Sequence, residues 1–314
     1  MTKRNIIAIS TVGMSREEWL EHRRQTIGGS DAAAIVGLSK WATPLTVYMD
    51  KKGLSPDKPD SIPMRIGREL EETVARLWME ETGKKCQRRN AILINPVYPF
   101  AHANIDRMVV GEDAFLECKT TSEMNMKQFK NGEFPANYYA QVMHYLMVLG
   151  EQYKRGYLAV LVGNRELFTF VIERDEEEIA ALAEQEKAFY ENYLLPGVMP
   201  DPTGAFQDAE ALGTLYPASD ADAEAVDLND MRDCFEAYIA ANAQKALCER
   251  IIDKAKQDIE ARLGNASAGF CGGHKVTWKE TVRNDIDRDA LKAMGVQITY
   301  KQKTTRTFRF TAGE

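Results

Sequence analysis

Apolar residues recur every three to four positions in several segments of the chain, and this spacing predicts amphipathic helices. The expected helices cover residues 15–25, 31–36, 44–52, 64–81, 135–149 and 175–195. Residues at the ends of two expected helices agree with this prediction. Ser15 with Glu18 three positions later is a capping-box pattern, and Gly83 is a helix-ending signal.

Short runs rich in β-branched and aromatic residues predict strands between these helices. We expect strands at residues 91–94, 103–110, 114–120, 156–162 and 166–173. Two hairpins are expected, one across Gly111-Glu112-Asp113 and one across Gly163-Asn164-Arg165. The alternation of helices and strands favours an α/β fold, and the order helix, strand, strand, helix suits an α/β/α sandwich.

A proline-rich stretch separates this region from the rest of the chain. Residues 196–217 hold four of the eleven prolines, together with small and acidic residues. We therefore expect a domain at 1–205, a linker at 206–222 and a C-terminal region at 223–314. The 3–4 spacing from Leu228 to Ile259 predicts one long helix of about 40 residues, or two packed helices. A small tail follows, with strands near 268–271, 274–281 and 304–310 and a helix at 287–294.

Composition narrows the class of protein. Hydrophobic residues make up 44% and charged residues 28%, as in ordinary globular proteins. No apolar run is long enough to span a bilayer, and the five cysteines are scattered without a C-x-x-C pair. We expect a cytoplasmic protein without a disulfide framework or a zinc site. The net charge of −7 counts against nucleic-acid binding but does not exclude it, because DNA is held by a local groove.

Three charged residues lie on the first expected hairpin. If Glu112 and Asp113 form its turn, Asp106 faces Lys119, and both share one face with Glu117. Two carboxylates with open coordination positions suit Mg²⁺, and a nearby lysine can orient a water or neutralise developing charge. The alternative is a salt-bridged sheet edge that faces solvent.

Two helices carry further polar residues in patterned positions. Glu71 lies on the apolar stripe formed by Gly67, Val74 and Trp78, which suggests a metal ligand or a partner for a buried base. Gln141 and Tyr145 are i, i+4 neighbours in the helix at 135–149, preceded by Tyr138. The alternatives are a surface glutamate and the polar edge of a core helix. We expect the combined site at one edge of the sheet.

A glycine-rich segment near the N-terminus has its own chemistry. Gly28 and Gly29 let a backbone approach a ligand closely, and Ser30 opens a short helix whose N–H groups attract phosphate. Arg23 can grip phosphate oxygens in a bidentate manner. Asp31 favours the other interpretation, a plain helix cap, because an acid there competes with an anion.

These motifs resemble a known series. Glu71, Asp106, Glu117-Cys118-Lys119 and Gln141-x-x-x-Tyr145 are similar to the motifs of PD-(D/E)XK nucleases of the RecB type. Trp19-x-x-x-Arg23 and the segment 26–31 resemble phage lambda exonuclease and the YqaJ-type viral recombinases. The resemblance covers roughly residues 15–200. It implies a restriction-endonuclease-like α/β/α core with a mainly helical C-terminal extension.

The resemblance also implies an activity and residue roles. It implies an Mg²⁺-dependent double-strand DNA exonuclease, 5′→3′ in direction and able to use Mn²⁺, that generates single-stranded tails for phage-type recombination. Asp106 and Glu117 would be metal ligands, Lys119 catalytic, and Glu71 and Gln141 supporting residues. Residues that would hold the 5′-phosphate or the DNA are Arg23, Ser30 and Tyr145.

Partners follow from the same resemblance. It implies a ring-shaped trimer, a RecT-type single-strand annealing protein as partner, and a phage or prophage origin, with no membrane contact. The alternatives are a nicking or structure-specific endonuclease with the same core and a non-catalytic DNA-binding adaptor. Two basic groups could follow the DNA backbone: Lys84, Lys85, Arg88 and Arg89, and Lys301, Lys303, Arg306 and Arg309.

Overall fold

The structure is a computed structural model that describes residues 6–56, 60–220, 222–282, 288–295 and 297. The chain forms two compact units, Met1–Pro217 and Ala218–Glu314.

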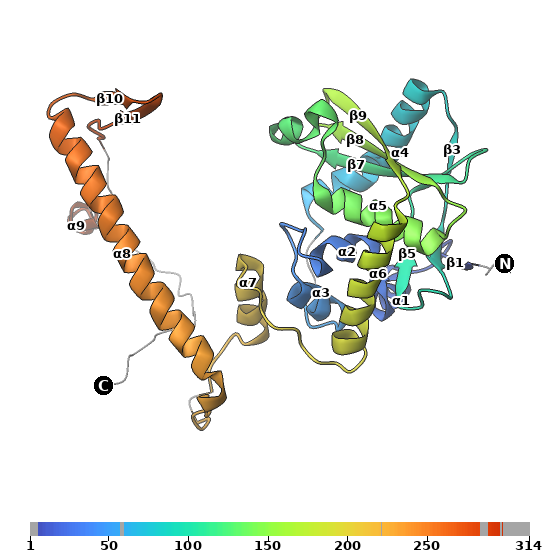
Figure 1. Cartoon of the computed structure of the whole chain (residues 1–314), viewed down its shortest axis with the longest axis horizontal. Helices are drawn as coiled ribbons and strands as arrows, with labels where there is room; N and C mark the ends of the chain where they lie inside the picture. Colours follow the sequence, from blue (N-terminus) through green and yellow to red (C-terminus); the bar gives the residue numbers. More distant parts are fainter. Residues whose placement is uncertain (1–5, 57–59, 221, 283–287, 296, 298–314) are drawn as a thin grey trace. The chain divides into compact units, whose positions relative to one another are not determined.

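The first unit is built on a five-stranded sheet (Figure 1). Its strands are, in spatial order, β3 (Cys86–Arg88), β6 (Arg107–Val109), β7 (Ala114–Thr121), β8 (Arg155–Val162) and β9 (Glu166–Glu173). β7 and β8 are parallel, and every other neighbouring pair is antiparallel. β7 is therefore the middle strand of the sheet.

Helices cover both faces of this sheet. On one face, Val74 and Trp78 of α4 (Ile62–Thr82) pack with Leu116 of β7. On the other face, the apolar side of α5 (Ala136–Leu149) packs in a larger core that includes Phe115 and Leu158. Side chains alternate along a strand, so successive residues of β7 contribute to opposite layers. The expected α/β/α arrangement is confirmed.

A smaller sheet carries the N-terminal motif. It has four strands in the order β1 (Ile7–Ser10), β4 (Ala91–Ile94), β5 (Ala101–Ala103) and β2 (Ile27–Gly28). Residues 103–110, expected to be one strand, belong to two: β5 lies in this sheet and β6 in the larger one. The chain passes between the two sheets at residues 104–106, and this places Asp106 outside both.

The predicted helix ends are present. Ser15 and Glu18 form the capping box of α1 (Arg16–Gln25), and Gly83 ends α4 with a positive φ of 69°. α2 (Gly29–Ile35), α3 (Pro44–Lys51) and α6 (Glu176–Phe189) lie near their expected positions, and η2 (Tyr190–Leu194) prolongs α6. The 3-10 segment η1 (Glu123–Gly132) was not predicted.

The first hairpin differs from the predicted register. β6 pairs with β7 through Arg107↔Leu116 and Met108↔Phe115, so four residues, 110–113, connect the strands instead of two. Gly111 at φ 82° makes this longer loop possible. The shift is by two residues, which keeps the face. Asp106 thus still shares its face with Glu117 and Lys119.

The expected linker at 206–222 is partly wrong. Residues Phe206–Leu215 form helix α7, which packs on α3 and belongs to the first unit. Asp208 is the reason, because this buried carboxylate accepts hydrogen bonds from the hydroxyls of Thr43 and Thr203. The first unit therefore ends at Pro217 and not at residue 205.

The second unit contains one long helix. α8 (Arg232–Leu263) is a single helix of 32 residues with no buried side chain, preceded by the short η3 (Asn229–Met231). The hairpin β10 (Ala268–Cys271) and β11 (His274–Thr277) follows, then α9 (Arg288–Ala293). The expected strand at 304–310 lies outside the described residues. Among the described helices, none has the length and apolar character needed to cross a membrane.

Candidate active site

The centre of the site lies on the middle strand of the large sheet, not at a sheet edge as expected. β7 carries Glu117, which is 3% exposed, and Lys119, whose Nζ lies 2.5 Å from Glu117 Oε1. The Lys119 ammonium also lies 5.6 Å from the centre of the Tyr138 ring. Burial opposes the charge of Lys119, but Glu117 and Asp106 raise the pKa of its ammonium above the ordinary value. Lys119 is thus held as a cation.

Asp106 meets these residues from the start of β6. Its Oδ2 accepts a hydrogen bond of 2.8 Å from the backbone N–H of Cys118. Burial raises the pKa of the Asp106 carboxyl well above its ordinary value, and the nearby charge of Glu117 adds to this effect. Two carboxylates in a shielded site destabilise each other unless a cation offsets their charge.

Gln141 and Tyr145 approach the site from α5. Gln141 Nε2 donates to Glu117 Oε1 and to the Tyr145 hydroxyl, both at 2.8 Å. Gln141 thereby fixes the carboxylate of Glu117 from the helix layer. The structure thus places these two i, i+4 neighbours beside Glu117.

The donor set fits a divalent cation. Glu117 Oε1 is engaged by Lys119 and Gln141, while Glu117 Oε2 is buried and has no hydrogen-bond partner. An unpartnered buried carboxylate oxygen is costly, and a cation would satisfy it. In the part of the chain that the structure describes, no three His, Cys, Asp or Glu residues gather as a ready metal cage. A site with one or two carboxylates and open positions is what Mg²⁺ uses.

Glu71 reaches this centre indirectly. Its Oε1 accepts a hydrogen bond from the guanidinium of Arg107, a side chain that is itself 3% exposed. Glu71 is thus the partner of a buried base, one of the two roles that its position on the apolar stripe suggested. Arg107 was not among the predicted site residues. The only available signal was an arginine inside an apolar strand, directly after Asp106.

The structure brings Arg23 and Ser30 together, the two residues that the resemblance assigns to the 5′-phosphate. Arg23 Nη2 lies 3.1 Å from Ser30 Oγ, and its guanidinium lies 4.8 Å from the centre of the Trp19 ring. This arrangement explains the Trp19-x-x-x-Arg23 spacing, because residues four apart share one side of α1. The arginine is held with its hydrogen-bond donors beside the serine hydroxyl.

Asp31 occupies the start of α2. Its Oδ2 accepts the Gly28 N–H at 2.8 Å and lies 2.5 Å from Lys51 Nζ. Burial would raise the pKa of Asp31, but Lys51 and Arg23 lower it below the ordinary value. One N–H group of the helix start is therefore already used. A phosphate here would depend on the side chains of Arg23 and Ser30.

The two glycines of this motif have a packing role that the sequence did not reveal. A methyl group on Gly29 would overlap the Tyr145 ring, and one on Gly28 would lie 2.9 Å from His102 Nε2. Gly28 and Gly29 thus allow close packing against residues of the core, including one next to the site. This packing accounts for both glycines, and the close approach of a ligand to their backbone stays a prediction.

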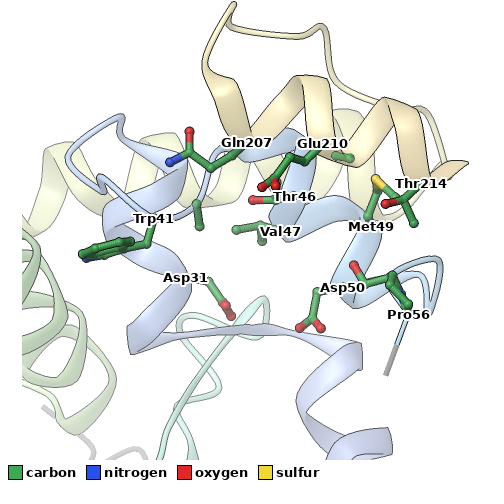
Figure 2. Close-up of a pocket in the computed structure, with 13 residues that line it drawn as sticks. Asp31, Trp41, Thr46, Val47, Met49, Asp50, Pro56, Gln207, Glu210 and Thr214 are labelled. Carbon is green, nitrogen blue, oxygen red and sulfur yellow. The ribbon is translucent and has the colours of Figure 1, made fainter. Parts of the chain in front are cut away.

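A separate pocket of about 460 Å³ lies between α2, α3 and α7 (Figure 2). Asp31, Asp50 and Glu210 line it, and Trp41, which is 83% exposed, stands at its rim (Figure 2). Its carboxylates would repel phosphate, so this pocket does not suit the DNA backbone.

Two of the four residues in the first basic group form ion pairs. Lys84 pairs with Glu112, and Arg88 pairs with Glu72 at 3.0 Å. The second group, at residues 301–309, lies outside the described residues. Contact of these two basic groups with the DNA backbone stays a prediction.

Comparison with known sequences gives two matches. Residues 18–152 match the YqaJ-like viral recombinase domain. The chain is 38% identical over 310 residues to an uncharacterized protein YqaJ from Bacillus subtilis (strain 168), which covers 98% of this chain and 97% of that protein.

Solved structures give weaker likenesses. An alkaline exonuclease (LHK-Exo) from Laribacter hongkongensis is 20% identical, with a TM-score of 0.47, and covers 56% of this chain and 91% of its own. A phage related exonuclease from Haemophilus somnus 129PT is 13% identical, with a TM-score of 0.41, and covers 55% of this chain and 97% of its own.

Proposed function

The chain belongs to the YqaJ-like viral recombinase family, and from this premise we propose that it is a metal-dependent DNA nuclease with its active site at Asp106, Glu117 and Lys119. The observation that carries the proposal is the environment of Glu117. One of its oxygens is fixed by a lysine and a glutamine, and the other is buried without a partner. Most buried carboxylate oxygens in proteins are hydrogen-bonded. Among the described residues Glu186 Oε2 also lacks a partner, but of these two glutamates only Glu117 is hydrogen-bonded to a lysine and lies beside Asp106.

Asp106 and Glu117 would hold Mg²⁺, or Mn²⁺ in its place. When bound, the ion supplies charge stabilisation at the phosphoryl group and a more acidic water. Lys119, 22% exposed at its side chain, is oriented by Glu117 and would donate to the reacting phosphate or to the attacking water. Gln141 would keep Glu117 in one orientation, with Tyr145 behind it.

We infer further that the substrate is the end of a duplex. Arg23 and Ser30 present a guanidinium and a hydroxyl that lie 3.1 Å apart, and together they suit the oxygens of a 5′-phosphate. The proposed reaction is therefore 5′→3′ degradation of linear double-stranded DNA, which leaves single-stranded tails for recombination. A RecT-type annealing protein and a trimeric assembly belong to the same proposal.

Linear duplex DNA labelled separately at each end tests the activity. With Mg²⁺, the wild-type protein should release nucleotides from the 5′-ends, and chelation should stop the release. Glu117→Ala and Lys119→Ala should each abolish cleavage while largely retaining DNA binding. Lys127→Ala, at an exposed lysine of η1, is the matched control. Near-normal cleavage by Glu117→Ala would refute the site.

Closed circular duplex distinguishes the alternatives. An exonuclease that needs a free end leaves it intact, whereas a nicking or structure-specific endonuclease would convert it to nicked or linear DNA. Binding of DNA without any cleavage, over a range of Mg²⁺ and Mn²⁺ concentrations, would favour a non-catalytic adaptor.

A further inference from the structure

Arg107 is a charged side chain enclosed by protein. It is 3% exposed and begins β6, immediately after Asp106. Its register partner is Leu116, which packs against α4. The Arg107 side chain therefore lies on the α4 face of the sheet, while Glu117 lies on the α5 face. Burial of such a charge requires partners.

The partners of Arg107 connect the two layers. Nη1 donates to Glu71 Oε1 and, at 2.8 Å, to the backbone carbonyl of Asp106. Nη2 donates to Glu72 Oε2 at 3.0 Å. One rigid guanidinium thus joins α4 to the peptide group of the proposed metal ligand. A planar fork with several donors can make these contacts together, and a lysine ammonium cannot reproduce that geometry.

Asp106 needs such a restraint. The pairing of β6 with β7 begins at Arg107↔Leu116, so the ladder does not hold the backbone of Asp106. Among the described hydrogen bonds its carboxylate accepts one, from Cys118, while Glu117 repels it and Lys119 attracts it. The contact of Arg107 with the Asp106 carbonyl is therefore the attachment of this backbone to α4.

We propose that Arg107 is a positioning residue, which holds Asp106 at the metal site by tying its backbone carbonyl to α4. In this arrangement Glu71 anchors the guanidinium and is not itself a metal ligand. The inference rests on the proposed function, because it assumes that Asp106 and Glu117 bind a divalent ion.

The direction in which cation affinity changes when Arg107 is removed distinguishes a positioning role from a purely electrostatic one. If Arg107 contributed only its positive charge near the site, its removal would strengthen the binding of a cation, and would also free Glu71 to bind it. If Arg107 positions Asp106, its removal weakens cation binding. Loss of a group that orients a metal ligand typically lowers metal affinity by about 10- to 100-fold.

Mn²⁺ alone is the probe, and its binding to the full chain is followed by the loss of the free-ion signal in electron paramagnetic resonance. The variants are Arg107→Met, Arg107→Lys and the double variant Glu71→Gln/Arg107→Met. The double variant removes the unpaired carboxylate that Arg107→Met leaves behind, and so protects the test against misfolding. Arg88→Met is the matched control, because Arg88 also pairs with Glu72 but its side chain is 56% exposed.

We expect Arg107→Met and the double variant to bind Mn²⁺ at least tenfold more weakly than wild type, roughly in line with the loss of other orienting groups. The affinity of Arg107→Lys for Mn²⁺ should lie between that of these variants and that of wild type, and the affinity of Arg88→Met should equal that of wild type. Unchanged or tighter binding by both Arg107→Met and the double variant would overturn the inference while leaving the proposed function standing. Absence of Mn²⁺ binding by the wild-type chain would overturn both.

Discussion

Replacement of Arg23 is the most informative test of how the protein would select DNA ends. Arg23 Nη2 lies 3.1 Å from Ser30 Oγ, and the Trp19 ring supports its guanidinium. Arg23→Ala removes the charged donor but leaves Ser30 and the fold of α2 in place. The expected defect is therefore confined to substrates that carry a phosphate at the 5′-end.

The size of the defect follows from the contact that is lost. A hydrogen bond to a charged group contributes about 1.5–3 kcal/mol. Because each 1.4 kcal/mol corresponds to a factor of about ten, the initial rate on 5′-phosphorylated ends should fall roughly 10- to 100-fold. The rate on 5′-hydroxyl ends should change little, since no phosphate contact exists there to lose.

The assay compares initial digestion rates of the same duplex with and without 5′-phosphate. Arg24→Ala is the matched control, because Arg24 is the next residue of α1 but has no contact with Ser30 among the described hydrogen bonds. Arg23→Lys keeps the charge without the guanidinium fork and should retain part of the preference. If wild type shows no preference for phosphate, or Arg23→Ala retains all of it, the assignment of Arg23 is refuted.

Three further predictions concern the fold around the site. Gly29→Ala should lower the free energy of unfolding by about 1–3 kcal/mol, because the new methyl group overlaps the Tyr145 ring. Urea unfolding measures this change, and an unchanged unfolding midpoint would contradict the packing of Gly29 against Tyr145. Burial lowers the pKa of His102 to about 3, so its contribution to stability is present above pH ~6.5 and is lost as the pH falls towards 3. Below pH ~6.5, the free energy of unfolding should fall with decreasing pH about 1.4 kcal/mol per pH unit more steeply in wild type than in His102→Gln. Urea titrations measure this free energy, and an equal pH dependence in the two proteins would refute a buried neutral imidazole. Finally, a chain ending at Pro217 should retain the helices of the first unit and unfold cooperatively. A chain ending at Ala205 should be less stable because it loses α7, and equal melting temperatures of the two chains by circular dichroism would show that α7 contributes nothing.

Features that depend on local periodicity could be predicted from the amino-acid sequence. The sequence predicted the helix ends at Ser15 and Gly83 from the residue types there. It also predicted the apolar stripe on α4 and the alternation on β7, because helices repeat every 3.6 residues and strands every 2. The same parity kept Asp106 on the correct face although the register was wrong by two residues. A shift of two residues returns every side chain of the strand to the same face, so the alternating pattern cannot distinguish the two registers.

Contacts between residues far apart in the sequence could not be predicted and became apparent only in the folded protein. Arg107 carries no periodic signal, and its role depends on α4 lying across the sheet from β6. The packing of Tyr145, more than a hundred residues away in the sequence, explains the glycine at position 29. The hydrogen bond between Thr43 and Asp208 explains why the first unit extends to α7. Such contacts follow from how the layers pack, and packing is a property of the whole core, not of a local segment.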